Sequence, residues 1–134
     1  MKFQDTTEHA IRFLTYMAKD PSKRYSTKEI AVTLDIPYKY MTKIVTLLSK
    51  AGLIESKKGS QGGVSLQKEP SKITVKDILE VLGDFSLDRC ILGDHKCNPD
   101  GVCAMHESWV PTRIKLEETF STTTLETLAK NERV

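Results

Sequence analysis

The sequence predicts a mainly α-helical protein with one small β-hairpin. Apolar residues recur at helical spacing in three segments before residue 51. Only a short turn around Pro37 separates the second and third of these segments. Two short alternating stretches then flank a glycine-rich connection, which is typical of a hairpin. Helix, helix, tight turn, helix and hairpin together indicate a winged helix-turn-helix, and the later helical pattern adds a C-terminal dimerisation helix.

The first two helices are expected over residues 5–19 and about 27–34. The apolar positions of the first helix are Ala10, Phe13, Leu14, Met17 and Ala18. Pro21 should end it, because a proline disfavours helical geometry in the preceding residue. Ser26 and Glu29 have the spacing of a capping box, in which each side chain accepts a free backbone N–H of the other residue. The apolar positions of the second helix are Ile30, Ala31 and Leu34.

The third helix should begin with Pro37 in its first position and end at Gly52 in a left-handed cap. Its apolar stripe consists of Met41, Ile44, Val45 and Leu48. Its polar side consists of Lys39, Thr42, Lys43, Thr46 and Lys50. Two strands are expected at 53–57 and 63–66, joined by a basic tip at 58–62. In such a layout the third helix enters a DNA major groove and the hairpin lies beside the backbone or in the minor groove.

A brief linker is expected at 69–71, and a fourth helix after it. Thr74 and Asp77 predict the cap of this helix, and Gly83 its end. The helical pattern resumes from about 104 to 120, where Pro111 must kink the helix or mark its start. Thr123 is expected to cap a last short helix through the T-x-x-E pattern.

The segment 104–120 carries apolar residues on more than one side, which indicates that a second subunit covers it. We therefore expect a homodimer that reads a palindromic site in double-stranded DNA. Residues 1–70 are expected to form the DNA-binding domain. Residues 71–134 are expected to supply a cysteine loop and the dimerisation helices.

Charge and composition agree with a DNA-binding protein of the cytoplasm. Residues 1–70 carry 12 Lys and Arg against 7 Asp and Glu, whereas residues 71–134 carry 8 against 11. The basic half is the expected nucleic-acid face. No apolar run approaches the length of a membrane span, and the start has no signal-peptide pattern. No catalytic constellation or nucleotide-binding glycine loop is present in the sequence, so we do not expect an enzyme.

The three cysteines of the chain lie within fourteen consecutive residues. Cys90, Cys97 and Cys103 are separated by turn-forming residues, and His106 follows the last of them by three positions. Thiolates are soft ligands that suit an iron–sulfur cluster or zinc. A closed Cys3His zinc site, a thiol redox switch without metal, and buried inert cysteines remain alternatives. An iron–sulfur electron carrier or a protein-interaction module would use the same residues without binding DNA.

The candidate DNA contacts lie on the second helix, the third helix and the hairpin. They are Thr27, Tyr38, Lys39, Tyr40, Thr42, Lys43, Lys57, Lys58, Ser60 and Gln61. Lysines suit phosphate or guanine, and tyrosine and threonine can bond to phosphate or base edges. Lysines in such a row can also form a solvated face, but the hairpin beside them favours DNA contact.

These motifs together resemble the IscR/NsrR/CymR family of bacterial winged-helix regulators. The likeness spans nearly the whole chain, from the T-x-H-A-I pattern at 7–11 through the glycines of the hairpin to the T-T-T-L-E-x-L pattern at 122–128. The resemblance implies a homodimer with a 2Fe–2S or 4Fe–4S cluster in the cysteine loop. It also implies that cluster status, nitric oxide or redox stress alters DNA affinity.

Two residues are candidates for the ligand that completes the cluster. His106 matches the C-x2-H arrangement of the IscR branch. Glu8 matches the carboxylate that NsrR-like members supply from the partner subunit. The chain differs from IscR at Thr42, where that branch has an acidic residue, and in the six-residue gap after Cys90. The resemblance therefore does not specify the operator sequence.

Overall fold

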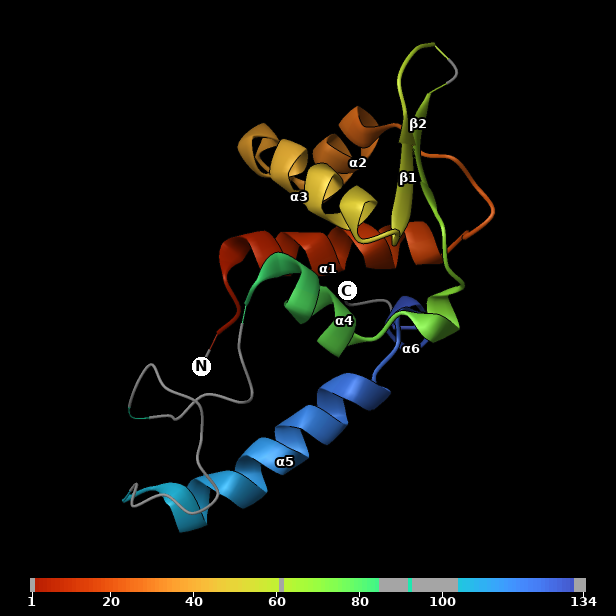
Figure 1. The fold of residues 1–134 in the computed structure, drawn as a ribbon. Coiled ribbons are helices and arrows are strands. Elements are labelled where there is room, and N and C mark those ends of the chain that lie inside the picture. The colour runs from red at the N-terminus through yellow and green to blue at the C-terminus, as the bar shows by residue number, and fades with distance from the viewer. Residues whose placement is uncertain (1, 61, 85–91, 93–103, 132–134) are drawn as a thin grey trace.

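The computed structural model describes residues 2–60, 62–84, 92 and 104–131 of the 134-residue chain. Six α-helices, one 3-10 helix and two strands occur within these residues (Figure 1). In chain order they are α1 (Asp5–Ala18), α2 (Thr27–Leu34), α3 (Tyr38–Lys50), β1 (Ile54–Lys57), β2 (Gly63–Leu66), η1 (Pro70–Lys72), α4 (Val75–Leu82), α5 (His106–Thr122) and α6 (Leu125–Ala129). The winged helix-turn-helix order predicted from the sequence is confirmed.

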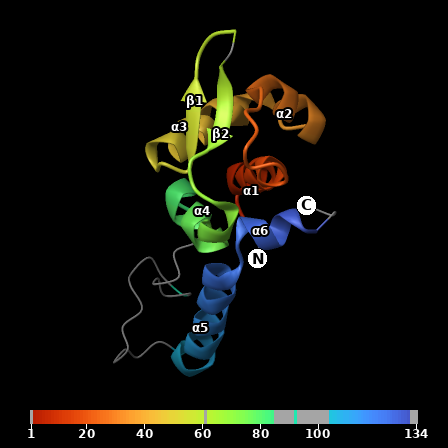
Figure 2. The same ribbon diagram turned by 90° about the vertical axis from the view of Figure 1, so that its right-hand side faces the viewer.

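Helix α1 lies at the centre of the molecule. Figures 1 and 2 show α2, α3 and the hairpin on one side of it and α4 and α6 on the other. Its apolar residues Phe13, Leu14 and Met17 are fully buried. The core around them also contains Ile73, Ile78, Leu82 and Leu125, which come from beyond residue 70. Residues on both sides of the boundary expected at residue 70 therefore share one hydrophobic core. The boundary separates the proposed DNA-binding role from the proposed cluster-binding and dimerisation role.

The turn between α2 and α3 is short and has a left-handed residue at its start. Ser26 Oγ accepts the N–H of Glu29 at 3.4 Å, which is the serine half of the expected capping box. Asp35 follows α2 in the left-handed region with φ +53°. Pro37 lies one position before the helix and not within its first turn, because its ψ of 135° is extended. The expected burial of Leu34 is only partial.

The hairpin is tied to the segment before α2 by a third extended residue. Strands β1 and β2 pair antiparallel, with Ile54 opposite Leu66. Tyr25 bridges Val64, and two backbone hydrogen bonds of 2.8 Å join them. Gly63 has φ +129°, and a Cβ there would lie 2.3 Å from the Tyr25 carbonyl oxygen. Only glycine allows this close approach, which fixes the base of the wing to the helical core.

Helices α4 and α6 begin at adjacent places in the fold. Thr74 and Asp77 form the predicted capping box, with hydrogen bonds of 3.0 and 3.1 Å. The cap of α6 is Thr124 and not the predicted Thr123, which instead follows the end of α5. A bridge pairs Thr74 with Thr124, so the two caps are held together. The expected linker at 69–71 overlaps the 3-10 helix η1, which runs one residue further and has Glu69 as its cap.

Helix α5 projects away from the core in both views (Figures 1 and 2). None of its described side chains is buried, and Ile114 is 55% exposed. Pro111 lies within the helix, so the prediction that it could mark the helix start is wrong. Helix α5 touches α4 and the start of the chain, where Lys76 Nζ lies 3.1 Å from Glu117 Oε1 and the rings of Phe3 and Phe120 are 5.7 Å apart.

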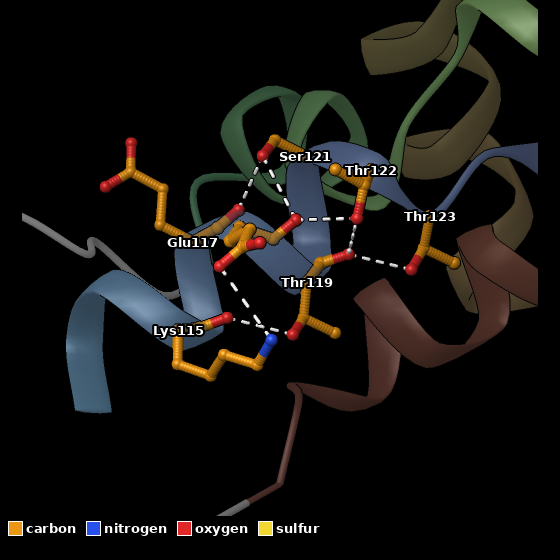
Figure 3. Close-up of polar contacts among 7 residues, drawn as sticks. Lys115, Glu117, Thr119, Ser121, Thr122 and Thr123 are labelled. Carbon is orange, nitrogen blue, oxygen red and sulfur yellow. Dashed lines mark hydrogen bonds and ion pairs between the residues drawn. The ribbon is translucent and has the colours of Figure 1, made fainter. Parts of the chain in front are cut away.

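The end of α5 is rich in hydroxyl side chains that bond to their own helix (Figure 3). Thr119 donates to the carbonyl of Lys115 at 2.8 Å, and Thr123 donates to the carbonyl of Thr119 at 2.7 Å. Ser121 and Thr122 make the same bond one turn back. These bonds compete with the regular helix and accompany its end at Thr122.

Within the described residues, no helix is long and apolar enough to cross a membrane.

Candidate nucleic-acid interface and metal ligands

The exposed side of α3 carries most of the predicted DNA contacts. Lys39, Thr42 and Lys43 are exposed, while Met41, Ile44 and Leu48 hold the opposite side in the core. Burial of this apolar stripe therefore fixes the orientation of α3 about its own axis. This packing fixes the direction in which the lysines and threonines point.

The two tyrosines at the start of α3 have different surroundings. Tyr38 is 73% exposed, as a contact residue requires. Tyr40 is half-buried, and its ring centroid lies 4.7 Å from that of His9 on α1. Lys39 Nζ lies 5.1 Å from the Tyr40 ring centroid, within the range of a cation–π contact. Tyr40 therefore packs between α1 and a lysine of the exposed face.

A groove of about 590 Å³ runs between the start of α2 and the exposed side of α3. Its lining residues are Thr27, Lys28, Tyr38, Met41, Thr42, Val45 and Thr46. Three of them, Thr27, Tyr38 and Thr42, are predicted contacts. Lys28 and Thr46 were not predicted as contacts, although Thr46 was placed on the same polar side of the helix as Thr42. Met41 and Val45 were assigned to the apolar stripe that packs in the core, and Val45 is only half-buried there.

The wing is basic, but an acidic residue offsets part of its charge. Lys57, Lys58 and Ser60 are exposed, and Gln61 lies outside the described residues. Glu55 on β1 lies 3.7 Å from Lys57 Nζ and 3.9 Å from Arg24 Nη2. Arg24 is a further cation at the base of the wing that the sequence interpretation missed.

The predicted cysteine ligands Cys90, Cys97 and Cys103 lie outside the described residues. His106 is the first residue of α5 and is half-buried. Glu8 is an exposed residue of α1, 3.8 Å from Lys2 Nζ. Among the residues that the structure describes, no three His, Cys, Asp or Glu side chains gather into a group that could hold a metal ion.

The start of α1 adjoins the point where the chain leaves α4 toward the cysteines. Asp84 Oδ2 accepts the backbone N–H of Gln4, the cap residue of α1, at 2.8 Å. Residue 84 immediately precedes the segment 85–91.

The first turn of α1 also carries a carboxyl with a lowered pKa. Lys2 donates a hydrogen bond to Asp5 at 3.0 Å, and this bond is the main cause that lowers the pKa of the Asp5 carboxyl. The charges of His9 and Lys39 lower it further by smaller amounts.

Comparisons with known proteins agree on the class. Residues 3–131 match the model of the Rrf2 family, described as an iron-dependent transcriptional regulator. A protein of Aquifex aeolicus that is classed as an HTH-type transcriptional regulator is 37% identical over 131 residues, covering 96% of this chain and 91% of the relative. The HTH-type transcriptional regulator NsrR of Shouchella clausii is 35% identical over 118 residues, covering 81% of this chain and 77% of the relative.

A solved structure shares the fold over nearly the full length. CymR, described as the global cysteine regulator of B. subtilis, superposes with a TM-score of 0.81 at 30% identity and covers 97% of each chain. These relatives are regulators of transcription and not enzymes.

Proposed function

Because the chain belongs to the Rrf2 family of winged-helix transcriptional regulators, we propose that it binds double-stranded DNA under the control of an iron–sulfur cluster. The observation that carries the DNA part is the fixed, exposed face of α3 with Lys39, Thr42 and Lys43. A helix of this kind fits the major groove, and the basic wing then lies beside the backbone or in the minor groove. We further propose a homodimer on a palindromic operator.

The donor set fits an iron–sulfur cluster by its chemistry. Cys90, Cys97 and Cys103 would supply three soft thiolates. The fourth ligand would be either His106 of the same chain or the Glu8 side chain supplied by the partner subunit. A cluster held by these residues would supply reactivity toward electrons and nitric oxide. The family description as iron-dependent supports iron over zinc as the resident metal.

Helix α1 offers a route by which a change near the cysteines can reach the DNA-binding helix. The Gln4–Asp84 hydrogen bond joins the start of α1 to the entry of the cysteine segment. Four positions after Gln4 comes Glu8, and the next residue, His9, contacts Tyr40 in the first turn of α3. A shift of α1 would therefore alter the pose of α3 on DNA. The signal would be cluster status, nitric oxide or redox stress.

The cluster is tested by purification without air, followed by iron and sulfide analysis and an absorption spectrum. Cys90→Ala, Cys97→Ala and Cys103→Ala should each lose iron and visible absorption. Met105→Ala is the matched control, because Met105 is 40% exposed, follows the last cysteine by two positions in the sequence and carries a thioether instead of a thiol. Iron content unchanged in all three cysteine variants would refute the cluster.

The fourth ligand is tested by comparing the spectra of His106→Ala and Glu8→Ala. Only loss of the true ligand should alter the cluster absorption. Glu107→Ala, an exposed neighbour of His106, is the control. Unaltered spectra in both variants would rule out both residues as ligands.

DNA binding is tested by fluorescence anisotropy with duplexes selected from a random library. Lys39→Ala and Lys43→Ala should weaken binding and reduce its salt dependence, since each removes a phosphate-neutralising charge. Lys72→Ala is the control, because this lysine is exposed on η1 and paired with Glu69 at 3.8 Å. Equal affinity in all variants would exclude this face of α3.

The three clustered cysteines also allow a second candidate, in which the thiols themselves respond to oxidation without metal. In that case the protein purified without air would contain no iron. Its DNA affinity would change on treatment with an oxidant and would return with a reductant.

A further inference from the structure

The exposed side of α3 carries two chemically different stripes. Lys39, Lys43 and Lys50 follow one another at helical spacing. Beside them, Thr42, Val45 and Thr46 turn toward α2 and line the groove between the two helices. The lysine stripe suits phosphates, whereas the second stripe presents mainly methyl groups.

The lining of the α2–α3 groove offers apolar contacts to a ligand group. Val45 has two methyl groups, and Thr42 and Thr46 have one each. Met41 borders the groove from below but is only 1% exposed. Lys28 is the one charged side chain among the lining residues, and it belongs to α2. A major groove presents mostly hydrogen-bonding edges, and the one apolar group on its base edges is the 5-methyl group of thymine.

We infer that Thr42, Val45 and Thr46 recognise the 5-methyl group of a thymine, so that they select a T·A pair at one position of each half-site. This inference rests on the proposed DNA binding by α3 and adds the base that its α2-facing side reads. The apolar contact distinguishes thymine from cytosine, which lacks the methyl group. The neighbouring lysines hold the helix on the backbone without regard to sequence.

The test uses replacement of thymine by uracil, which removes only the methyl group. Duplexes selected from a random library with this protein are resynthesised with deoxyuridine at each thymine in turn, and the dissociation constant is measured by anisotropy. Loss of one buried methyl group should weaken binding about fourfold. We expect this loss at one thymine of each half-site.

Protein variants show which side chains make the contact. Thr42→Ser and Thr46→Ser each remove a methyl group but keep the hydroxyl and the helix. Combined with Val45→Ala, they should reduce the thymine-to-uracil affinity ratio at that position from about fourfold toward one. Lys39→Ala should weaken binding to both duplexes equally. Thr33→Ser, at an exposed position of α2 outside the groove, should leave the ratio unchanged.

Two results would overturn the inference while leaving DNA binding intact. One is that no uracil replacement weakens binding, which would indicate that the groove holds the sugar–phosphate backbone instead. The other is that uracil weakens binding equally in the wild-type protein and in all groove variants, which would place the methyl contact elsewhere. Failure to select any duplex would instead overturn the proposed function itself.

Discussion

Replacing Ile114 by alanine should weaken dimerisation without unfolding the subunit. Helix α5 has no buried side chain within the described part of the chain, and Ile114 is one of its large apolar residues. Alanine has the highest helix propensity, so the substitution should not disturb α5. Its effect should therefore fall on whatever covers this side chain, which we propose to be a second subunit.

The size of the effect follows from the exposed fraction of the side chain. Complete burial of an isoleucine side chain stabilises by about 1.5–3 kcal/mol. Because 55% of Ile114 is exposed in the single chain, a partner would add about half of that per subunit. A symmetric dimer contains the contact twice, which gives about 1.5–3 kcal/mol per dimer. The dimer dissociation constant should thus rise roughly 10- to 150-fold.

Sedimentation-velocity ultracentrifugation over a dilution series measures this constant. Lys115→Ala is the matched control, because its side chain is 75% exposed on the same helix and lies 3.8 Å from Glu118. The control should dimerise like the wild-type protein, and circular dichroism should show the same helix content in all three. Wild-type dimers that Ile114→Ala leaves equally stable would refute the proposed α5 interface.

Three further predictions concern the fold and its coupling to DNA. Thr74→Ala removes the oxygen that accepts the Asp77 N–H and should lower the free energy of unfolding in urea by about 1 kcal/mol. Burial raises the pKa of the Tyr25 phenol, so the folded chain holds this proton more tightly than the unfolded chain. Stability should therefore fall as pH rises past the ordinary tyrosine value of about 10, and Tyr25→Phe should reduce this fall. His9→Ala should keep the cluster spectrum but reduce the affinity difference between cluster-loaded and cluster-free protein, because the contact with Tyr40 is lost.

Each of these predictions has its own control. Ser71→Ala, at an exposed position outside α4, should leave stability unchanged, and an equal loss there would contradict the cap argument. Tyr38→Phe, at the exposed start of α3, should keep the alkaline fall, and a fall of the same size in Tyr25→Phe would contradict the burial argument. His9→Phe retains a ring against Tyr40 and should restore the affinity difference. If His9→Ala leaves that difference intact, α1 is not the route.

Local chemistry made most elements predictable. The bounds of α2 and the β-hairpin follow from periodicity and turn residues, and the Thr74–Asp77 cap needs only two residues three positions apart. The cap of α6 was misplaced by one residue because Thr123 and Thr124 are chemically identical. The choice between them depends on the bridge from Thr74 to Thr124, which is a contact between distant parts of the chain.

The sequence by itself determined the order of the elements, the side of α3 that faces solvent, and the chemical character of the cysteine donors. These properties depend on residue type and spacing within one or two turns. Only the tertiary structure decided that Gln4 meets Asp84, that His9 meets Tyr40, and that α2 and α3 enclose a methyl-lined groove. Such contacts join residues up to 80 positions apart, and they exist only because the whole core fixes the helices relative to one another.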